Sequence, residues 1–243
     1  MTDTMGKPLD GQIALVTGAS RGIGAASAAA LAAAGAHVII TARTAAGLEE
    51  LEDRIHEAGG SATIAPLDLV DGDAIARLAS AIAERWQRLD ILVMNAATLG
   101  TLTPVAAIDG KEFNRVLTLN LIAQQALIAN FDPLLRRSAA GKVIALTSSV
   151  GRVPRAYWGA YGASKAALEV LVTSYGTEMA SISTVRTAII DPGATRTQMR
   201  ARAFPGEDAA TVKDPQVVGD AITALCIAGF ESTAYQALGK SAV

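Results

Sequence analysis

Residues 16–24 read VTGASRGIG, and this stretch decides the fold. It joins a short apolar run at residues 12–17 to an Ala-rich, helix-forming segment at 22–34. Between a strand and a helix, one glycine permits the tight turn, one lets the backbone approach a pyrophosphate, and one allows close packing of helix and strand. The helix N-terminus attracts the anion. We therefore predict a nucleotide-binding turn.

The spacing within this turn narrows the kind of site. Gly18, Gly22 and Gly24 form the pattern G-x-x-x-G-x-G, which differs from G-x-G-x-x-G and lacks the Gly-Lys-Ser/Thr ending of a P-loop. The predicted cofactor loop also includes three residues that lie between these glycines: Ser20, Arg21 and Ile23.

Outside this turn, short β-branched runs alternate with longer Ala/Leu segments, a pattern typical of βαβ units. Predicted strands occupy residues 12–17, 37–41, 62–67, 91–94, 143–147 and 185–190. Predicted helices occupy residues 22–34, 48–58, 74–87, 111–137 and 161–180, and Asp214-Pro215 opens a last helix. Pro66 weakens the third strand, and Pro133 is expected to break or kink the fourth helix near its end. The expected fold is α/β: a Rossmann-like, doubly wound parallel sheet of about seven strands with helices on both faces.

The length and composition favour one domain. The chain has 243 residues, of which 51% are hydrophobic and 18% charged. This composition excludes an intrinsically disordered protein. No repeat or linker divides it. We predict a flexible tail at residues 1–9 and a single nucleotide-binding domain at 10–243, with a substrate lid at 196–213 that orders when the cofactor binds.

Charge and cysteine content exclude several classes of function. The net charge of −2 provides no bulk attraction to nucleic acid or to a membrane surface, so neither partner is expected. Cys226 is the one cysteine and lies in an apolar run, which favours a buried thiol and a reducing, cytoplasmic location. His37 and His56 lack neighbouring ligands in metal-site spacing, so no metal is expected.

The end of the second predicted strand indicates which dinucleotide binds. Ala42 occupies the place where a carboxylate would accept the ribose hydroxyls of NAD(H). Arg43 follows it, and Arg21 of the glycine turn can approach the same place. Two guanidinium groups suit a 2′-phosphate, so we predict NADP(H) in preference to NAD(H); the alternative is that Arg43 only contacts solvent.

A second cluster predicts proton transfer. Tyr161 and Lys165 are four residues apart, so they share one face of the predicted helix. A free phenol has a pKa near 10, and a nearby ammonium stabilises its phenolate. Ser148 ends the fifth predicted strand, at the carboxyl edge of the sheet where ligands of open α/β folds bind.

Taken together, these motifs resemble the short-chain dehydrogenase/reductase family over residues 10–197. The shared motifs occur in the family's order: the glycine turn, Asn95-Ala96-Ala97, Asn120, Ser148, Tyr161, Lys165 and Pro192-Gly193. The spacing of thirteen residues from Ser148 to Tyr161 is also that of the family.

The resemblance implies a catalytic role for four residues. Tyr161 would be the general acid in carbonyl reduction and the base in alcohol oxidation. Lys165 would lower the pKa of Tyr161 and hydrogen-bond the nicotinamide ribose. Ser148 would orient the substrate oxygen, and Asn120 would hold a water that connects Lys165 to solvent.

Further cofactor contacts follow from the same resemblance. Asp68 with Leu69 would contact the adenine, and Asn95 with Ala96 would steady the sheet edge beside the cofactor. Around the nicotinamide carboxamide the resemblance places Pro192, Gly193, Thr195 and Thr197. Three positions depart from the family pattern: Met94, Ala97 and Thr195.

The implied reaction is hydride transfer between nicotinamide and a small carbonyl or secondary alcohol. The apolar segment 152–160 suits a hydrophobic substrate, whereas Arg152 and Arg155 meet either an anionic group, such as that of an acyl carrier, or water. The family also implies a homodimer or homotetramer. The alternative is a dinucleotide-binding sensor or structural protein without turnover; such proteins generally lack the Tyr or the Lys.

Overall fold

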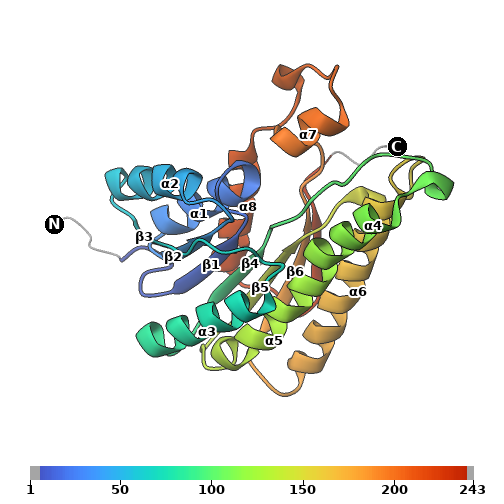
Figure 1. The fold of residues 1–243 in the computed structure, drawn as a ribbon. Helices are drawn as coiled ribbons and strands as arrows, with labels where there is room; N and C mark the ends of the chain where they lie inside the picture. Colours follow the sequence, from blue (N-terminus) through green and yellow to red (C-terminus); the bar gives the residue numbers. More distant parts are fainter. Residues whose placement is uncertain (1–5, 240–243) are drawn as a thin grey trace.

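The computed structural model describes residues 6–239 and contains one seven-stranded sheet (Figure 1). All neighbouring strands are parallel, in the order β3-β2-β1-β4-β5-β6-β7. The strands are β1 (Ile13–Thr17), β2 (His37–Thr41), β3 (Ser61–Ile64), β4 (Ile91–Met94), β5 (Lys142–Leu146), β6 (Arg186–Asp191) and β7 (Ala234–Ala237). This confirms the predicted doubly wound α/β fold.

Helices cover both faces of the sheet (Figure 1). One face carries α1 (Gly22–Ala33), α2 (Ala46–Glu57) and α8 (Pro215–Ala228). The other carries α3 (Gly72–Trp86), α5 (Ala123–Leu135) and α6 (Gly159–Ala180), with α4 (Gly110–Leu117) leading into α5. The short helix α7 (Gln198–Ala203) projects from the body at the top of the view in Figure 1.

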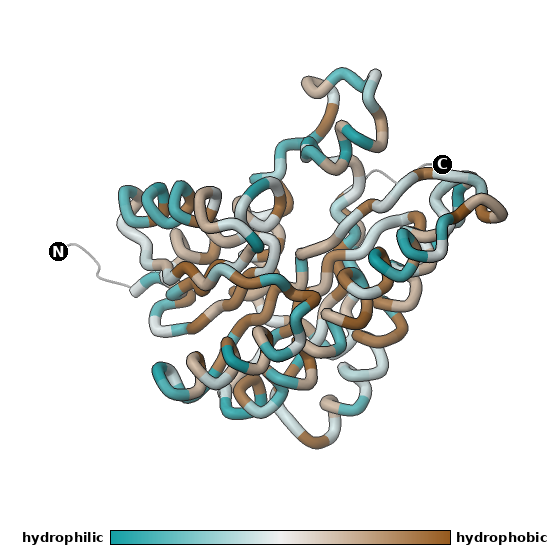
Figure 2. The backbone as a smooth tube through the Cα atoms, in the orientation of Figure 1, coloured by the Kyte–Doolittle hydropathy of each residue, from teal (hydrophilic) through white to brown (hydrophobic). Residues whose placement is uncertain are grey.

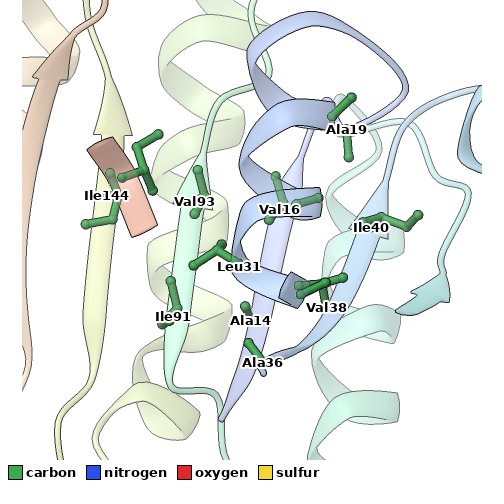
Figure 3. Packing of buried hydrophobic residues seen from close by; sticks show 14 of the residues in the cluster. Ala14, Val16, Ala19, Leu31, Ala36, Val38, Ile40, Ile91, Val93 and Ile144 are labelled. Atoms are coloured by element: carbon green, nitrogen blue, oxygen red, sulfur yellow. The ribbon is translucent and has the colours of Figure 1, made fainter. Parts of the chain in front are cut away.

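Two apolar cores sandwich the sheet, because alternate residues of each strand point to opposite faces. In β1, Ala14 and Val16 pack toward α1, whereas Ile13 and Leu15 pack toward α3 and α5. Figure 3 shows the first of these cores, where Leu31 of α1 lies over Val16 and Val93. The strands are accordingly apolar along their length, and the hydrophilic residues lie on the outer helices (Figure 2).

The observed elements differ from the predicted ones in a few places. β3 ends at Ile64, before Pro66. The helix predicted at 111–137 is divided by a π-helical turn at Thr118–Ile122, and Pro133 lies in the last turn of α5. β7 lay outside the predicted strand ranges because it is short and largely exposed.

The start of the domain requires a correction. Leu9, which the sequence assigned to the flexible tail, is 1% exposed, and its N–H donates to the carbonyl of Ala34 at 2.9 Å. The packed domain therefore begins before residue 10, and residues 1–5 of the predicted tail lie outside the described residues. Within the described chain, no helix is both long and apolar enough to cross a membrane.

Candidate active site

The glycine turn has the geometry that its sequence predicts. Gly18 (φ +65°) and Gly22 (φ +58°) adopt left-handed backbone conformations that favour glycine. At Gly24 a Cβ atom would lie 2.5 Å from Nδ2 of Asn95, so only glycine fits. α1 then begins without a side-chain cap and without an acidic residue in its first turn. Its first N–H groups therefore suit an anion such as a dinucleotide phosphate.

Asn95 joins the glycine turn to the end of β4. Its Nδ2 donates to the carbonyl oxygens of Thr17 at 2.8 Å and Gly18 at 3.2 Å. The Thr17 hydroxyl accepts from the backbone N–H groups of Asn95 and Ala96 at 3.0 and 3.1 Å. Ala97 has no positive φ, so alanine fits where the family has glycine. Thr17 is thus a positioning residue that sequence analysis did not single out.

Arg21 of the glycine turn and Arg43 after β2 are the two arginines that the sequence places near the adenosine ribose. Arg21 and Arg43 are both exposed, and neither forms an ion pair within the described residues. Asp68 is exposed beyond β3, and its Oδ1 accepts from the N–H of Val70 at 3.2 Å, whereas Leu69 is buried. Free guanidinium groups at this edge suit an additional phosphate.

Tyr161 and Lys165 lie in the first half of α6 and are almost completely buried, with exposed fractions of 7% and 2%. The ammonium of Lys165 donates to the carbonyl of Leu146 at 2.7 Å and lies 5.7 Å from the centroid of the Tyr161 ring. Ser148 is the second residue after β5 and is half-buried. The sheet edge therefore brings together the end of β5 and the predicted acid–base pair.

The protonation of this pair differs from the expectation. Burial raises the pKa of the Tyr161 phenol above its ordinary value, and the negative charge of Asp191 acts in the same direction. Burial lowers the pKa of Lys165 to about 8, and the carboxylate of Glu169 opposes that change. The net shift of the Tyr161 pKa is therefore upward, opposite to the lowering that Lys165 alone would produce. Tyr161 is held as a neutral phenol, which is the form that donates a proton.

Asn120 lies in the π-helical turn, and its side chain is hydrogen-bonded within the protein. Its Oδ1 accepts from the N–H of Thr98 at 2.8 Å, and its Nδ2 donates to the Thr98 carbonyl at 2.8 Å and to the Ser164 hydroxyl at 3.0 Å. The Ser164 hydroxyl in turn donates to the carbonyl of Tyr161 at 2.7 Å. Asn120 thus braces the loop after β4 against the turn of α6 that carries Tyr161.

The segment after β6 approaches the glycine turn. Gly193 is left-handed (φ +62°), and its N–H donates to Oδ1 of Asp191 at 2.9 Å. Thr195 is buried, with its hydroxyl facing the carbonyls of Pro192 and Gly193 at 3.2 and 3.3 Å.

Thr197 lies where this segment and the glycine turn meet. A Cβ placed on Gly22 would lie 3.3 Å from Cγ2 of Thr197. The Thr197 hydroxyl accepts from the N–H of Arg200 at 3.1 Å, so its own proton remains available to a ligand. The predicted phosphate and carboxamide segments therefore lie side by side.

An aromatic cluster covers Tyr161 from the side of the predicted lid. The Trp158 ring lies 6.1 Å from the Tyr161 ring and 5.7 Å from the Phe204 ring, measured between centroids. Val150, Leu99 and Met199 pack in the same cluster. The surroundings of the phenol are therefore apolar, as expected for a hydrophobic substrate, and Arg155 is exposed nearby in sequence.

Among the described residues, no group of three or more His, Cys, Asp or Glu side chains lies close enough together to hold a metal ion. His37 instead contacts the hydroxyls of Ser61 and Thr63 at 3.0 and 2.9 Å. His56 accepts from the backbone N–H of Ala62 at 3.4 Å. Both histidines thus have packing roles.

Comparison with known proteins agrees with this geometry. The model of the short chain dehydrogenase family matches residues 12–208. The uncharacterized oxidoreductase YciK of Escherichia coli K12 is 38% identical over 210 residues, which are 85% of this chain and 82% of that protein.

Two solved structures share the fold at high identity. A protein from Pseudomonas syringae classed as a short chain dehydrogenase is 38% identical, with a TM-score of 0.90 over 94% of this chain and 95% of that one. Another from Escherichia coli CFT073, in complex with NADPH, is 36% identical, with a TM-score of 0.88 over 94% and 98% of the two chains.

Proposed function

This chain belongs to the short-chain dehydrogenase family of oxidoreductases, and on that premise we propose that it transfers a hydride between NADP(H) and a carbonyl or secondary alcohol. The observation that carries the proposal is the buried Tyr161–Lys165 pair, whose ammonium donates to the carbonyl of Leu146 at the end of β5, two residues before Ser148. An alternative without turnover would not need a buried lysine next to a phenol.

The residues of the glycine turn fit the proposed dinucleotide. The uncapped N-terminus of α1 binds the pyrophosphate, and Gly18 and Gly22 let the backbone approach it. Arg21 and Arg43 bind the 2′-phosphate, Asp68 and Leu69 meet the adenine, and the segment from Pro192 to Thr197 holds the carboxamide. The preference for NADP(H) over NAD(H) rests on Arg21 and Arg43, which form no ion pair with residues 6–239, and on the NADPH complex of the Escherichia coli CFT073 relative.

In the proposed mechanism NADPH supplies the hydride when bound. Ser148 orients the substrate oxygen, and Tyr161 donates its phenolic proton to that oxygen. Burial keeps Tyr161 protonated until the oxygen becomes basic, and the Lys165 ammonium stabilises the phenolate that remains. In alcohol oxidation the same residues act in reverse.

Re-protonation of Tyr161 needs a path to solvent. Both N–H groups of the Asn120 side chain are occupied, by Thr98 and Ser164, and its Oδ1 already accepts from Thr98. We assign the expected water to the main-chain carbonyl of Asn120, next to the π-helical turn.

A carbonyl panel tests the function. Purified protein should consume NADPH with at least one apolar aldehyde or ketone, and Tyr161→Phe should lower kcat by about 10²–10⁴-fold because the general acid is missing. The variant should bind NADPH as tightly as wild type. NADPH binding without turnover on any substrate would instead favour the sensor alternative.

We also propose a homodimer or homotetramer in a reducing compartment such as the cytoplasm. Ile122 and Val170 are apolar and 58% and 68% exposed on the helices that flank the site, which supports burial against a second copy. Cys226 is buried, and burial raises the pKa of its thiol to about 12, so it is poorly reactive. A monomer in light scattering at micromolar concentration would contradict the oligomer.

A further inference from the structure

Glu169 is a buried carboxylate that the mechanism above does not use. It lies one turn beyond Lys165 on α6, as Lys165 lies one turn beyond Tyr161, so the three side chains share one face of the helix. Its side chain is 11% exposed. A charge in such a place is costly unless it is paired, so its partners indicate what it does.

Both carboxylate oxygens of Glu169 bind side chains next to Ser148. Oε1 accepts from the hydroxyl of Thr147 at 2.6 Å, and Oε2 accepts from Nε of Arg152 at 2.6 Å. Thr147 directly precedes Ser148, and Arg152 follows the 3₁₀ turn Ser149–Gly151. Glu169 therefore fixes both sides of Ser148 to the helix that carries Tyr161.

Lys165 also binds the end of β5. Its ammonium donates to the carbonyl of Leu146, the residue before Thr147. Lys165 and Glu169 thus bind successive residues at the end of β5, with opposite charges on one helix face. An anion in this place favours the charged form of the lysine, against the effect of burial.

We propose that Glu169 is a positioning residue of the reaction: it keeps the Lys165 ammonium charged at neutral pH and holds the end of β5, with Ser148, against α6. It acts through these residues and touches neither substrate nor cofactor. The inference rests on the proposed oxidoreductase function for its kinetic consequence, but not for its effect on Lys165.

Other charged and titratable groups surround this pair and enter the expected result. They are Tyr161 on α6, Arg152 after the 3₁₀ turn, Asp191 at the end of β6, Lys213 before α8 and Tyr235 on β7. Arg152 also lies over the Tyr235 ring, 3.4 Å from its centroid. Loss of the carboxylate would leave the Arg152 charge uncompensated, which disfavours the Lys165 ammonium further.

The charge of Lys165 can be measured directly, because the chain has only six lysines. In a pH titration followed by NMR of ¹³C-labelled lysine side chains, Glu169→Gln should lower the pKa of Lys165 by about one unit. The Lys165 signal is assigned from its loss in Lys165→Met. Glu178→Gln removes the same charge from an exposed position on α6, roughly 20 Å along the helix from Lys165, and should not move the signal.

The direction of the shift separates the proposal from a purely structural role. If Glu169 only packs, Glu169→Gln keeps its volume and the Lys165 pKa stays the same, or rises toward 10.5 if the site opens to water. Arg152→Met provides the opposite test in a protein that keeps Glu169: the unpaired carboxylate should raise the Lys165 pKa. An unchanged or raised pKa in Glu169→Gln would overturn the proposal, as would a lowered pKa in Arg152→Met.

The kinetic arm uses the NADPH-dependent reduction of a carbonyl. A pKa one unit below about 8 lowers the charged fraction of Lys165 about fivefold near pH 8, and kcat should fall by that factor with KM unchanged. Near pH 6 the lysine is charged in both proteins, so kcat should recover. A loss of kcat that persists near pH 6 would contradict the charge role of Glu169. If the wild type shows no turnover, only the proposed function is contradicted, because the NMR titration still tests the role of Glu169.

Discussion

Gly24 contacts Gly18 more closely than any side chain would permit, because a Cβ on Gly24 would lie 2.3 Å from the Gly18 carbonyl oxygen. The first turn of α1 therefore rests directly on the strand–helix turn. This contact sets the distance between the N-terminus of the helix and the end of β1, where the dinucleotide phosphate is proposed to bind.

Gly24→Ala should consequently damage both the fold and cofactor binding. We expect a loss of about 1–3 kcal/mol in the free energy of unfolding, since the backbone must shift to admit the methyl group. NADPH should bind at least about tenfold more weakly. Thermal unfolding and fluorescence titration measure the two effects. Gly72→Ala is the matched control, because no atom lies within 4 Å of its Cβ position and its φ is ordinary; equal effects of both variants would contradict the packing argument.

Arg43 should determine the choice between the two dinucleotides. A charge-assisted contact with the 2′-phosphate is lost in Arg43→Ala, so NADPH binding should weaken by about 10–100-fold while NADH binding stays the same. Arg21→Ala should have a similar but smaller effect. Adding a carboxylate through Ala42→Asp should favour NADH. The measurement is the ratio of the two dissociation constants, and an unchanged ratio in Arg43→Ala would show that this arginine contacts only solvent.

The lid predicted at residues 196–213 contains α7 and a 3₁₀ turn at Ala209–Thr211. It is braced internally, since Arg200 binds Glu207 at 2.5 Å and lies 3.7 Å from the Phe204 ring centroid. We expect NADPH to slow tryptic cleavage after the exposed Arg202, and Phe204→Ala to weaken that protection by removing the contact with Trp158. Cleavage at the same rate with and without NADPH would argue against ordering of the lid by the cofactor.

Local patterns in the sequence predicted the sheet well. The strands at 37–41 and 91–94 have the predicted bounds, because strands covered on both faces are apolar throughout. The pairing of Tyr161 with Lys165 depends only on their spacing along a helix, so the sequence predicted it as well.

Features that depend on distant contacts were not predictable. The π-helical turn at Thr118–Ile122 changes hydrogen bonding without changing helical composition. The partners of Glu169 depend on how α6 lies along β5, which no local pattern specifies. The net pKa shifts of Tyr161 and Lys165 depend on burial in the folded chain, which the pairing of the two residues in the sequence does not specify.

Burial of Lys165 also predicts a conflict between stability and activity. Its pKa is about 8 in the fold against 10.5 ordinarily, so between these values the unfolded chain binds the proton and the folded chain does not. Wild-type stability should therefore rise with pH across this interval, and below pH 8 the fold bears the full cost of a buried charge. Removing the charge should stabilise the protein where that cost is present.

Lys165→Met should thus be about 1–2 kcal/mol more stable than wild type near pH 7, after allowance for the lost bond to Leu146, although it should be almost inactive. The advantage should disappear near pH 10.5, where the wild-type lysine is neutral when folded. Urea unfolding at several pH values measures this, with Lys111→Met, an exposed lysine of α4, as control. If Lys165→Met were less stable than wild type at pH 7, the hydrogen bond from Lys165 to Leu146 would outweigh the desolvation of the ammonium. The lysine would then stabilise the fold in addition to its catalytic role.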